Sequence, residues 1–275
     1  MTNMEDWRLP RLILCADDFA LSRGVSETIA ALLASGKLNA TSCMTTMPGW
    51  SADAALLRGL PGSVEVGLHL TLTGERPLTT MPQIAPWGVL PRIDPLTWQA
   101  MRGRVPLTEI AGEVAAQFDA FIAAVGRPPD FVDGHQHAHA LPGIRDVVLA
   151  ETARRAPSAW LRDCTDDLDA ILARPFAGKA IGSAFHSRGF RRAAAAYGLR
   201  CNTGFAGHYS FAGDYRALFP RFLNRPGEMH LVMCHPGAGT PPGDTIAAAR
   251  AGEAAALREL PVARLAAAAG LAFAA

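Results

Sequence analysis

The chain has 275 residues, of which 49% are hydrophobic, so it is long and apolar enough for one large domain with a substantial core. Its formal net charge at pH 7 is only +1, and no run of lysine or arginine stands out. Composition therefore argues against a protein that binds nucleic acid by neutralising its phosphates.

Short runs of β-forming residues alternate with stretches of helical periodicity along the chain. We expect strands, in chain order, over 12–15, 40–44, 64–70, 131–133, 160–162, 199–203 and 231–234. Helical spacing lies between or after them, over 25–33, 51–60, 107–125, 144–154, 186–197 and 245–270. This alternation predicts an α/β fold with a mostly parallel sheet and helices outside it. About seven parallel strands at this length favour an irregular TIM-like (β/α) barrel.

One stretch interrupts this alternation. Residues 74–106 are rich in proline and glycine and show little periodicity, so we expect a long excursion that overhangs the active site. We find no internal repeat, flexible linker or break in composition elsewhere. The sequence therefore predicts a single domain over 1–275.

The cysteines and the N-terminus indicate the cellular compartment in which the protein works. The five cysteines are scattered and form no Cys-x-x-Cys pair, a pattern typical of reduced thiols. The first residues are acidic and lack the apolar stretch of a signal peptide. No segment approaches the roughly 18 uninterrupted apolar residues of a membrane span. We therefore expect a soluble, cytoplasmic protein without a membrane span.

The most informative segment is 133–139, which carries Asp133, His135, His137 and His139 at alternating positions. In an extended strand, residues two apart point to the same face, so Asp133, His135 and His137 would face one volume. Imidazole and carboxylate are common ligands of catalytic divalent metals. The alternative is a polar loop that happens to contain three of the chain's eight histidines.

Other titratable residues also stand where predicted strands end. In parallel barrels the active site forms at the carboxyl ends of the strands, so we expect these groups to meet at one mouth. They are Asp17, Asp18, His69, Asp133, His135, Arg162, Asp163 and His235.

The adjacent carboxylates Asp17 and Asp18 would repel each other unless a cation or a raised pKa relieves them. Neighbouring strand residues point in different directions, so one could bind a metal while the other faces the substrate. Alternatively, one of them caps the following helix, although Ser22 or Ser26 could provide that cap instead.

His69 and His235 each have a simpler alternative. A lone histidine in a strand, such as His69, is more often a core residue than a ligand. His235 precedes Pro236 and Gly237, where the chain leaves the sheet, so it is either a general acid or base or a solvent-exposed turn residue. The convergence of several strand ends favours the functional interpretation of both.

Four motifs together resemble one known family. They are Ala16–Phe19, Gly67–Thr71, Asp133–His137 and Cys234–Gly237. Their order and approximate spacing resemble those of the YdjC-like carbohydrate deacetylases, which include chitooligosaccharide and hopanoid-associated deacetylases. The resemblance runs from Leu12 to His235 and implies an irregular TIM-like barrel. One departure is Ala20, where the family usually has glycine.

The resemblance implies roles for particular residues. Asp18, His69 and His135 would be metal ligands, Asp17 the catalytic base and His235 the catalytic acid. Members are metal-dependent and often dimeric, so the resemblance also implies a bound divalent metal, Mg²⁺ or Zn²⁺, and a homodimer.

Three further residues are expected in supporting positions. Asp133 or His137 could orient a ligand imidazole from behind. Arg162, after the fifth predicted strand, resembles an arginine near the site in relatives.

The predicted activity is metal-assisted hydrolysis of an N-acetyl group on an amino sugar or oligosaccharide, with a small N-acetylated carbohydrate as partner. A metal-dependent phosphoesterase or amidohydrolase is the main alternative enzyme, although those usually place a His-x-His pair at the first strand. A non-catalytic metal- or sugar-binding protein is a third candidate. It would be favoured if Asp17 and His235 lay far from the metal, because a binder needs no acid and base.

Overall fold

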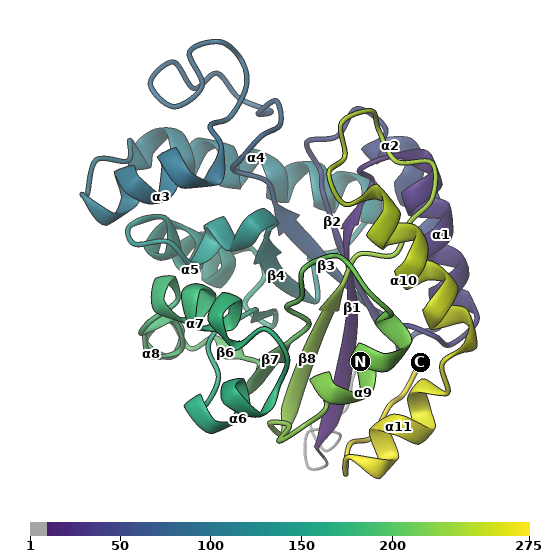
Figure 1. Cartoon of the computed structure of the whole chain (residues 1–275). Coiled ribbons are helices and arrows are strands. Elements are labelled where there is room, and N and C mark those ends of the chain that lie inside the picture. Colours follow the sequence, from purple (N-terminus) through teal and green to yellow (C-terminus); the bar gives the residue numbers. More distant parts are fainter. Residues whose placement is uncertain (1–9) are drawn as a thin grey trace.

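The strands of the computed structural model, which describes residues 10–275, form one sheet in which every pair is parallel (Figure 1). The order across the sheet is β6-β5-β4-β3-β2-β1-β8-β7. In chain order the strands are β1 (Arg11–Phe19), β2 (Ala40–Cys43), β3 (Glu65–Leu70), β4 (Phe131–Gly134), β5 (Trp160–Leu161), β6 (Arg200–Cys201), β7 (Gly204–Ala206) and β8 (Met229–Cys234). The acidic N-terminal residues used to predict the compartment lie outside the described residues.

The two edges of this sheet are neighbours along the chain. Strand β6 pairs with β5 and β7 pairs with β8, yet only Asn202 and Thr203 separate β6 from β7. So short a connection keeps the two edges within roughly 10 Å of each other. The sheet therefore curls as a TIM-like barrel does, as the sequence predicted. The predicted sixth strand, 199–203, covers β6 and this connection, whereas β7 was not predicted.

Helices surround the curled sheet. They are α1 (Arg23–Ala34), α2 (Trp50–Asp53), α3 (Ile93–Met101), α4 (Leu107–Val125), α5 (Ile144–Arg155), α6 (Leu168–Ala173), α7 (Ala177–His186), α8 (Phe190–Ala196), α9 (Tyr215–Phe222), α10 (Ala247–Glu259) and α11 (Val262–Ala268), with 3₁₀ segments η2 (Ala54–Leu57) and η3 (His135–Ala140). None of the described helices is long and apolar enough to cross a membrane.

Several helix predictions need correction. The predicted helix 51–60 is two short pieces, α2 and η2, and the predicted helix 245–270 breaks at Pro261, which lacks a backbone N–H, into α10 and α11. The predicted helix 186–197 is mainly α8. The excursion 74–106 contains helix α3, which the sequence did not predict. By contrast, α4 has the predicted bounds.

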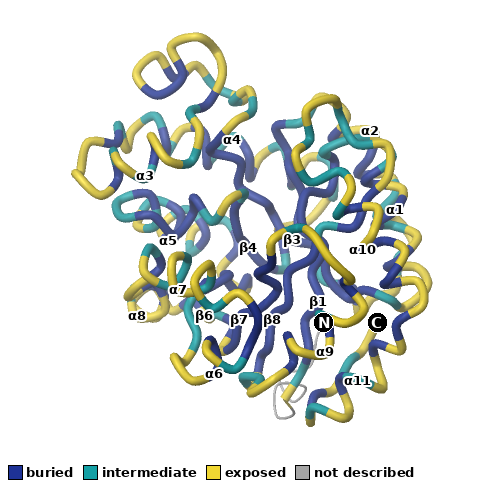
Figure 2. The backbone as a smooth tube through the Cα atoms, viewed as in Figure 1, coloured by how far each residue is buried: buried dark blue, intermediate teal, exposed yellow. Residues whose placement is uncertain are grey.

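The sheet separates two apolar cores. The inner core fills the curl of the sheet, and Ile13 and Cys15 of β1 face it, whereas Leu12 and Leu14 face the outer core beneath the helices. Figure 2 shows the consequence: buried strands at the centre and helices whose outer faces are exposed. Gly67 of β3 belongs to this packing, because a Cβ there would lie 2.4 Å from the ring of Phe131.

One strained position follows β1 directly. Ala20 has φ +77°, a left-handed conformation that costs a residue with a Cβ but not glycine. We expect Ala20→Gly to raise the free energy of unfolding by roughly 0.5–1 kcal/mol in urea denaturation. The matched control is Ala31→Gly on the exposed face of α1, which should lower it by about 1 kcal/mol. Equal destabilisation by both variants would contradict the strain at Ala20.

Candidate functional site

The site is the polar upper layer of the inner core. On five strands, the inward positions change from apolar or small to polar two residues further along the chain, which is the spacing expected for one face of a strand. The pairs are Cys15 and Asp17, Gly67 and His69, Phe131 and Asp133, Trp160 and Arg162, and Met233 and His235. The strand ends therefore bring their polar groups together at one mouth, as predicted.

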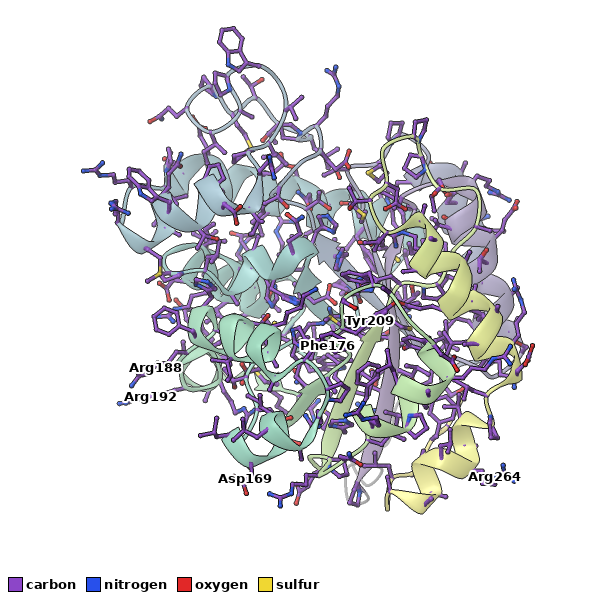
Figure 3. All side chains as sticks on the ribbon, in the orientation of Figure 1. Asp169, Phe176, Arg188, Arg192, Tyr209 and Arg264 are labelled. Atoms are coloured by element: carbon purple, nitrogen blue, oxygen red, sulfur yellow. The ribbon has the colours of Figure 1, made fainter. Side chains whose placement is uncertain are left out.

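Asp17, His69 and His235 of this layer line a cavity of about 640 Å³, a size typical of small-molecule sites. Its lining includes Asp17, Asp18, Leu21, Met47, His69, Glu75, His135, Gln136, His137, Lys179, His208, Tyr209, Phe211, Met233, His235, residues 241–246 and Arg250. Tyr209 lies near the centre of the molecule, whereas Arg188, Arg192 and Arg264 lie at its periphery (Figure 3).

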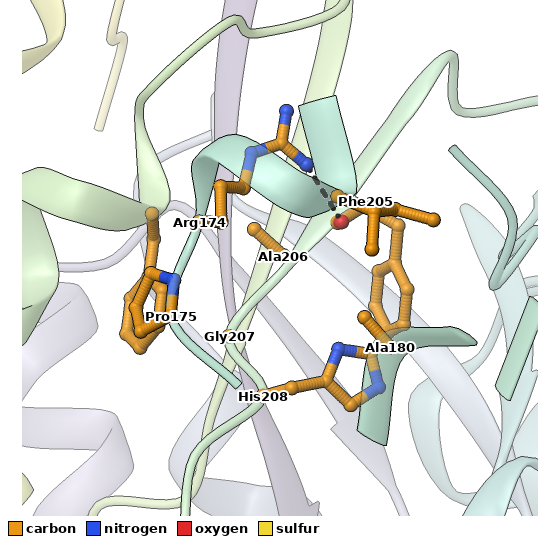
Figure 4. Close-up of a pocket in the computed structure, with 9 residues that line it drawn as sticks. Arg174, Pro175, Ala180, Phe205, Ala206, Gly207 and His208 are labelled. Atoms are coloured by element: carbon orange, nitrogen blue, oxygen red, sulfur yellow. Dashed lines mark hydrogen bonds between the residues drawn. The ribbon is translucent and has the colours of Figure 1, made fainter. Parts of the chain in front are cut away.

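A second hollow lies beside this cavity and is far smaller. Arg174 donates a hydrogen bond of 3.0 Å to the carbonyl oxygen of Phe205 there, next to His208 (Figure 4). Its volume of about 10 Å³ is at most that of one water molecule. The larger cavity is therefore the candidate site.

An irregularity in β1 brings both aspartates into the cavity. The pairing register with β2 shifts between Ala16 and Phe19, and Asp18 has φ +65°. Both carboxylates consequently line the cavity, where they have different partners: Asp17 contacts Arg162, whereas Asp18 contacts His135 and Arg250. The capping alternative was wrong, because Ser22 caps α1 by accepting a hydrogen bond from the backbone N–H of Val25.

Asp18, His69 and His135 form one cluster. The Asp18 Oδ1 atom lies 3.0 Å from His135 Nδ1 and 3.3 Å from His69 Nε2. One potential ligand atom from each residue lies within 4.8 Å of the others, so a single cation could contact all three. Burial opposes ionisation of Asp18, but its histidine neighbours and Arg250 hold its pKa well below the usual value.

His69 is fixed from behind by Asp133. The His69 Nδ1 atom lies 2.7 Å from Asp133 Oδ1 and 3.0 Å from the hydroxyl of Ser42. Burial alone would lower the pKa of His69, but Asp133 and Asp18 raise it to about 10. The negative charges around His69 therefore hold a proton on its buried imidazole at neutral pH.

Asp17 is held by a buried arginine. Arg162 donates to both carboxylate oxygens of Asp17 at 2.6 Å and lies 2.5 Å from Asp133 Oδ2. Burial opposes ionisation of Asp17, but Arg162 keeps its pKa well below the ordinary value. Cys15, Asp17 and Asp133 also have metal-competent atoms close together, but the Arg162 guanidinium already supplies the cation for that group.

His235 completes the group around Asp17. Its Nε2 atom lies 3.9 Å from Asp17 Oδ2, and its backbone N–H donates to Glu253. Burial lowers the pKa of His235, although Asp18 and Asp17 oppose the shift. The imidazole is therefore neutral at pH 7, and it is not the solvent-exposed turn residue of the alternative interpretation.

The histidine-rich segment does not continue as a strand. Gln136 and His137 have φ +52° and +60°, so the extended backbone ends at Gly134 and the same-face argument fails for His137. His137 nevertheless lines the cavity, beside Phe205 and His208. His139 is buried elsewhere, with its Nε2 atom 2.8 Å from the carbonyl oxygen of Arg162.

Sequence reasoning missed the contribution of α10. Arg250 donates at 2.8 Å to Asp18 Oδ2 and at 2.8 Å to Asp244. Glu253, three residues further, accepts from His235 and from the hydroxyl of Tyr209. Burial raises the pKa of Glu253 to about 7. The available signal was a pair of charges on the buried face of a predicted helix, where unpaired charges are costly.

Comparisons with known proteins agree with this architecture. A family model described as YdjC-like protein matches residues 11–268. A chitooligosaccharide deacetylase of Salmonella paratyphi B is 36% identical over 234 residues, which cover 82% of this chain and 81% of the relative.

Other relatives match over shorter regions. Chitooligosaccharide deacetylases of Escherichia fergusonii and Enterobacter sp. are 37% and 39% identical over 145 residues, or 52% of this chain, and the chain spans about half (56%) of their length.

A solved structure shares the fold. It is from Enterococcus faecalis V583 and is described as a proposed cellobiose-phosphate cleavage protein. It has a TM-score of 0.68 and 19% sequence identity and covers 97% of both chains. At that identity the likeness concerns the fold alone.

Removing the buried arginine should destabilise the protein strongly. Arg162→Met leaves Asp17 and Asp133 without their shared cation, so we expect the free energy of unfolding to fall by about 3–5 kcal/mol. Urea denaturation measures the change. Arg264→Met, at an exposed position of α11, is the control and should change stability by less than about 0.5 kcal/mol. A loss below about 1 kcal/mol for Arg162→Met would contradict the role of the ion pairs.

The buried histidines predict a loss of stability in acid. Burial lowers the pKa of His139, His208 and His230 to about 4 each. In the unfolded chain these histidines bind protons near pH 6.5. The stability that each buried, neutral histidine contributes is therefore complete above that pH and is lost as the pH falls toward 4.

A variant of His230, which does not line the cavity, isolates one of these contributions. When the pH falls from 7 to 5, the free energy of unfolding should decrease by about 1–2 kcal/mol more in wild type than in His230→Gln. The substitution retains an N–H donor for the carbonyl of Phe222, with which His230 Nε2 interacts. Equal losses in wild type and variant would show that His230 is not buried in its neutral form.

Proposed function

Because the chain belongs to the YdjC-like protein family, we propose that it is a carbohydrate N-deacetylase, which hydrolyses the acetamido group of an amino sugar or oligosaccharide. The observation that carries the proposal is a single cavity shared by a metal-competent cluster, a carboxylate and a neutral imidazole. The names of the curated relatives support the same activity.

The cluster of Asp18, His69 and His135 fits a divalent cation. Two imidazoles and one carboxylate suit Mg²⁺, Zn²⁺ and similar ions. Asp133 behind His69 Nδ1 favours the tautomer in which Nε2 presents its lone pair to the cluster. The raised pKa of His69 supports the fit, because the same negative charge that retains a proton attracts a metal ion. A bound ion supplies Lewis-acid activation of water and of the acetyl carbonyl.

Asp17 serves as the base in this proposal. Its lowered pKa keeps it ionised, and the two hydrogen bonds from Arg162 fix its carboxylate toward the cavity. It accepts a proton from the water that attacks the acetyl carbon. Because its conformation is fixed before substrate binds, no side-chain rotation is needed at the moment of transfer.

His235 serves as the acid. Its neutral ring first requires a proton, and Asp17 Oδ2, 3.9 Å away, is positioned to pass on the proton taken from water. His235 then donates this proton to the departing amine nitrogen as the carbon–nitrogen bond breaks, and acetic acid leaves and ionises to acetate in water. One proton thus moves from water to the amine, so the pair returns to its starting state.

Three further points stay predictions: whether the metal is Mg²⁺ or Zn²⁺, whether the protein is a homodimer, and whether it is cytoplasmic. The resemblance and the composition are their basis.

Two adjacent substitutions separate the base from the metal ligand. Asp17→Asn should lower turnover by about 10²–10⁴-fold, since an amide cannot accept the proton, yet leave metal affinity within a few-fold of wild type. Asp18→Asn should weaken metal binding itself. Acetate release and metal titration of the purified variants measure the two properties. Loss of metal from Asp17→Asn, or full activity of that variant, would contradict the division of roles.

A further inference from the structure

His137 has no role in the proposed reaction, although it lies two residues from the cluster member His135 and lines the same cavity. It is not part of the cluster formed by Asp18, His69 and His135. Its ring stands edge-on to Phe205 at 5.5 Å and to His208 at 5.9 Å between ring centroids. These contacts place it on the wall of the cavity formed by η3 and the segment after β7.

The backbone at His137 is strained. Gln136 and His137 are consecutive residues in the left-handed region, which costs roughly 1–2 kcal/mol for each residue with a Cβ. Such strain gathers at binding sites, where surrounding structure holds a side chain in an otherwise unfavourable position. Of the seven described non-glycine residues with positive φ, four line the cavity: Asp18, Gln136, His137 and Phe211.

The polar atoms of the His137 ring are unpaired. Its Nδ1 atom is buried without a hydrogen-bond partner, and no described residue forms a hydrogen bond with Nε2. A buried N–H without an acceptor is rarer than a buried unpaired acceptor, which favours the tautomer with its proton on Nε2. The ring then has one donor left for a ligand oxygen.

The neighbours of His137 hold the ring in place and offer it no acceptor. Phe205 and His208 pack edge to face at 5.1 Å (Figure 4), and His208 Nε2 is already engaged with the hydroxyl of Ser183 at 3.0 Å. Lys179, also on this wall, donates to the backbone carbonyl of Tyr209. No described side chain thus accepts a hydrogen bond from His137, which leaves its donor available to a ligand in the cavity.

We propose that His137 binds the substrate, donating a hydrogen bond from Nε2 to a hydroxyl or acetamido oxygen of the sugar, and takes no part in holding metal. This inference rests on the proposed deacetylase activity for the identity of the ligand. Because contact with the sugar is made in the ground state as well as during reaction, its loss should weaken binding more than it slows turnover.

The test removes the donor and keeps the ring. His137→Phe retains the packing against Phe205 and His208, and His137→Asn, which tolerates positive φ, guards against a folding defect. The control is His186→Phe, the same change on α7 outside the cavity. Steady-state acetate release from N,N′-diacetylchitobiose and a metal titration are measured for all variants and wild type.

We expect both His137 variants to raise KM about tenfold or more, to leave kcat within about threefold, and to keep the metal affinity of wild type. His186→Phe should match wild type throughout. Weakened metal binding in the His137 variants would make His137 a metal ligand and overturn the proposal, as would an unchanged KM.

If wild type releases no acetate, the proposed function fails and the inference is decided by binding. Ligand-observed NMR with the same disaccharide then compares wild type and His137→Phe. Binding by wild type that the variant loses supports a sugar contact by His137. Equal binding by both, or no binding by wild type, overturns it.

Discussion

The buried guanidinium of Arg162 is the interaction on which the rest of the site depends. Two carboxylates, Asp17 and Asp133, lie in the interior of the barrel, where an unpaired charge is very costly. Arg162 neutralises both and, through Asp133, fixes the ring of His69. The arginine itself is fixed from its backbone, because its carbonyl oxygen is 2.8 Å from His139 Nε2. The proposed base and one proposed metal ligand therefore share a single support.

Below this layer the barrel is apolar, and above it lies the cavity. The change occurs within one period of strand alternation, as from Cys15 to Asp17 or from Phe131 to Asp133. This sharp boundary matters for catalysis. Apolar packing excludes water below the charged groups, which strengthens their electrostatic interactions, and the groups are open to the cavity on one side only. Helix α10 completes the boundary, since Arg250 and Glu253 contact Asp18 and His235 from the side.

Much of this arrangement could be predicted from sequence, and each failure has a physical cause. Alternation located His69, Asp133 and Arg162 correctly, because β3, β4 and β5 stay extended up to these residues or end one residue before them. It failed at His137, where φ is positive and a period of two no longer applies. The contact of Arg250 with Asp18 spans 232 residues of sequence, so only the folded chain reveals it. The division of the sixth strand escaped prediction because it depends on two pairing partners, β5 and β8, at opposite edges of the sheet.

Acetate release from N-acetylated mono- and oligosaccharides tests the central claim most directly. The protein is stripped with a chelator, reloaded with Mg²⁺ or Zn²⁺, and assayed beside a generic phosphate ester. The account predicts equal amounts of acetate and free amine from at least one sugar, loss of both on chelation, recovery on reloading, and no phosphate release. Phosphate release, or no acetate from any sugar with any divalent metal, would contradict it.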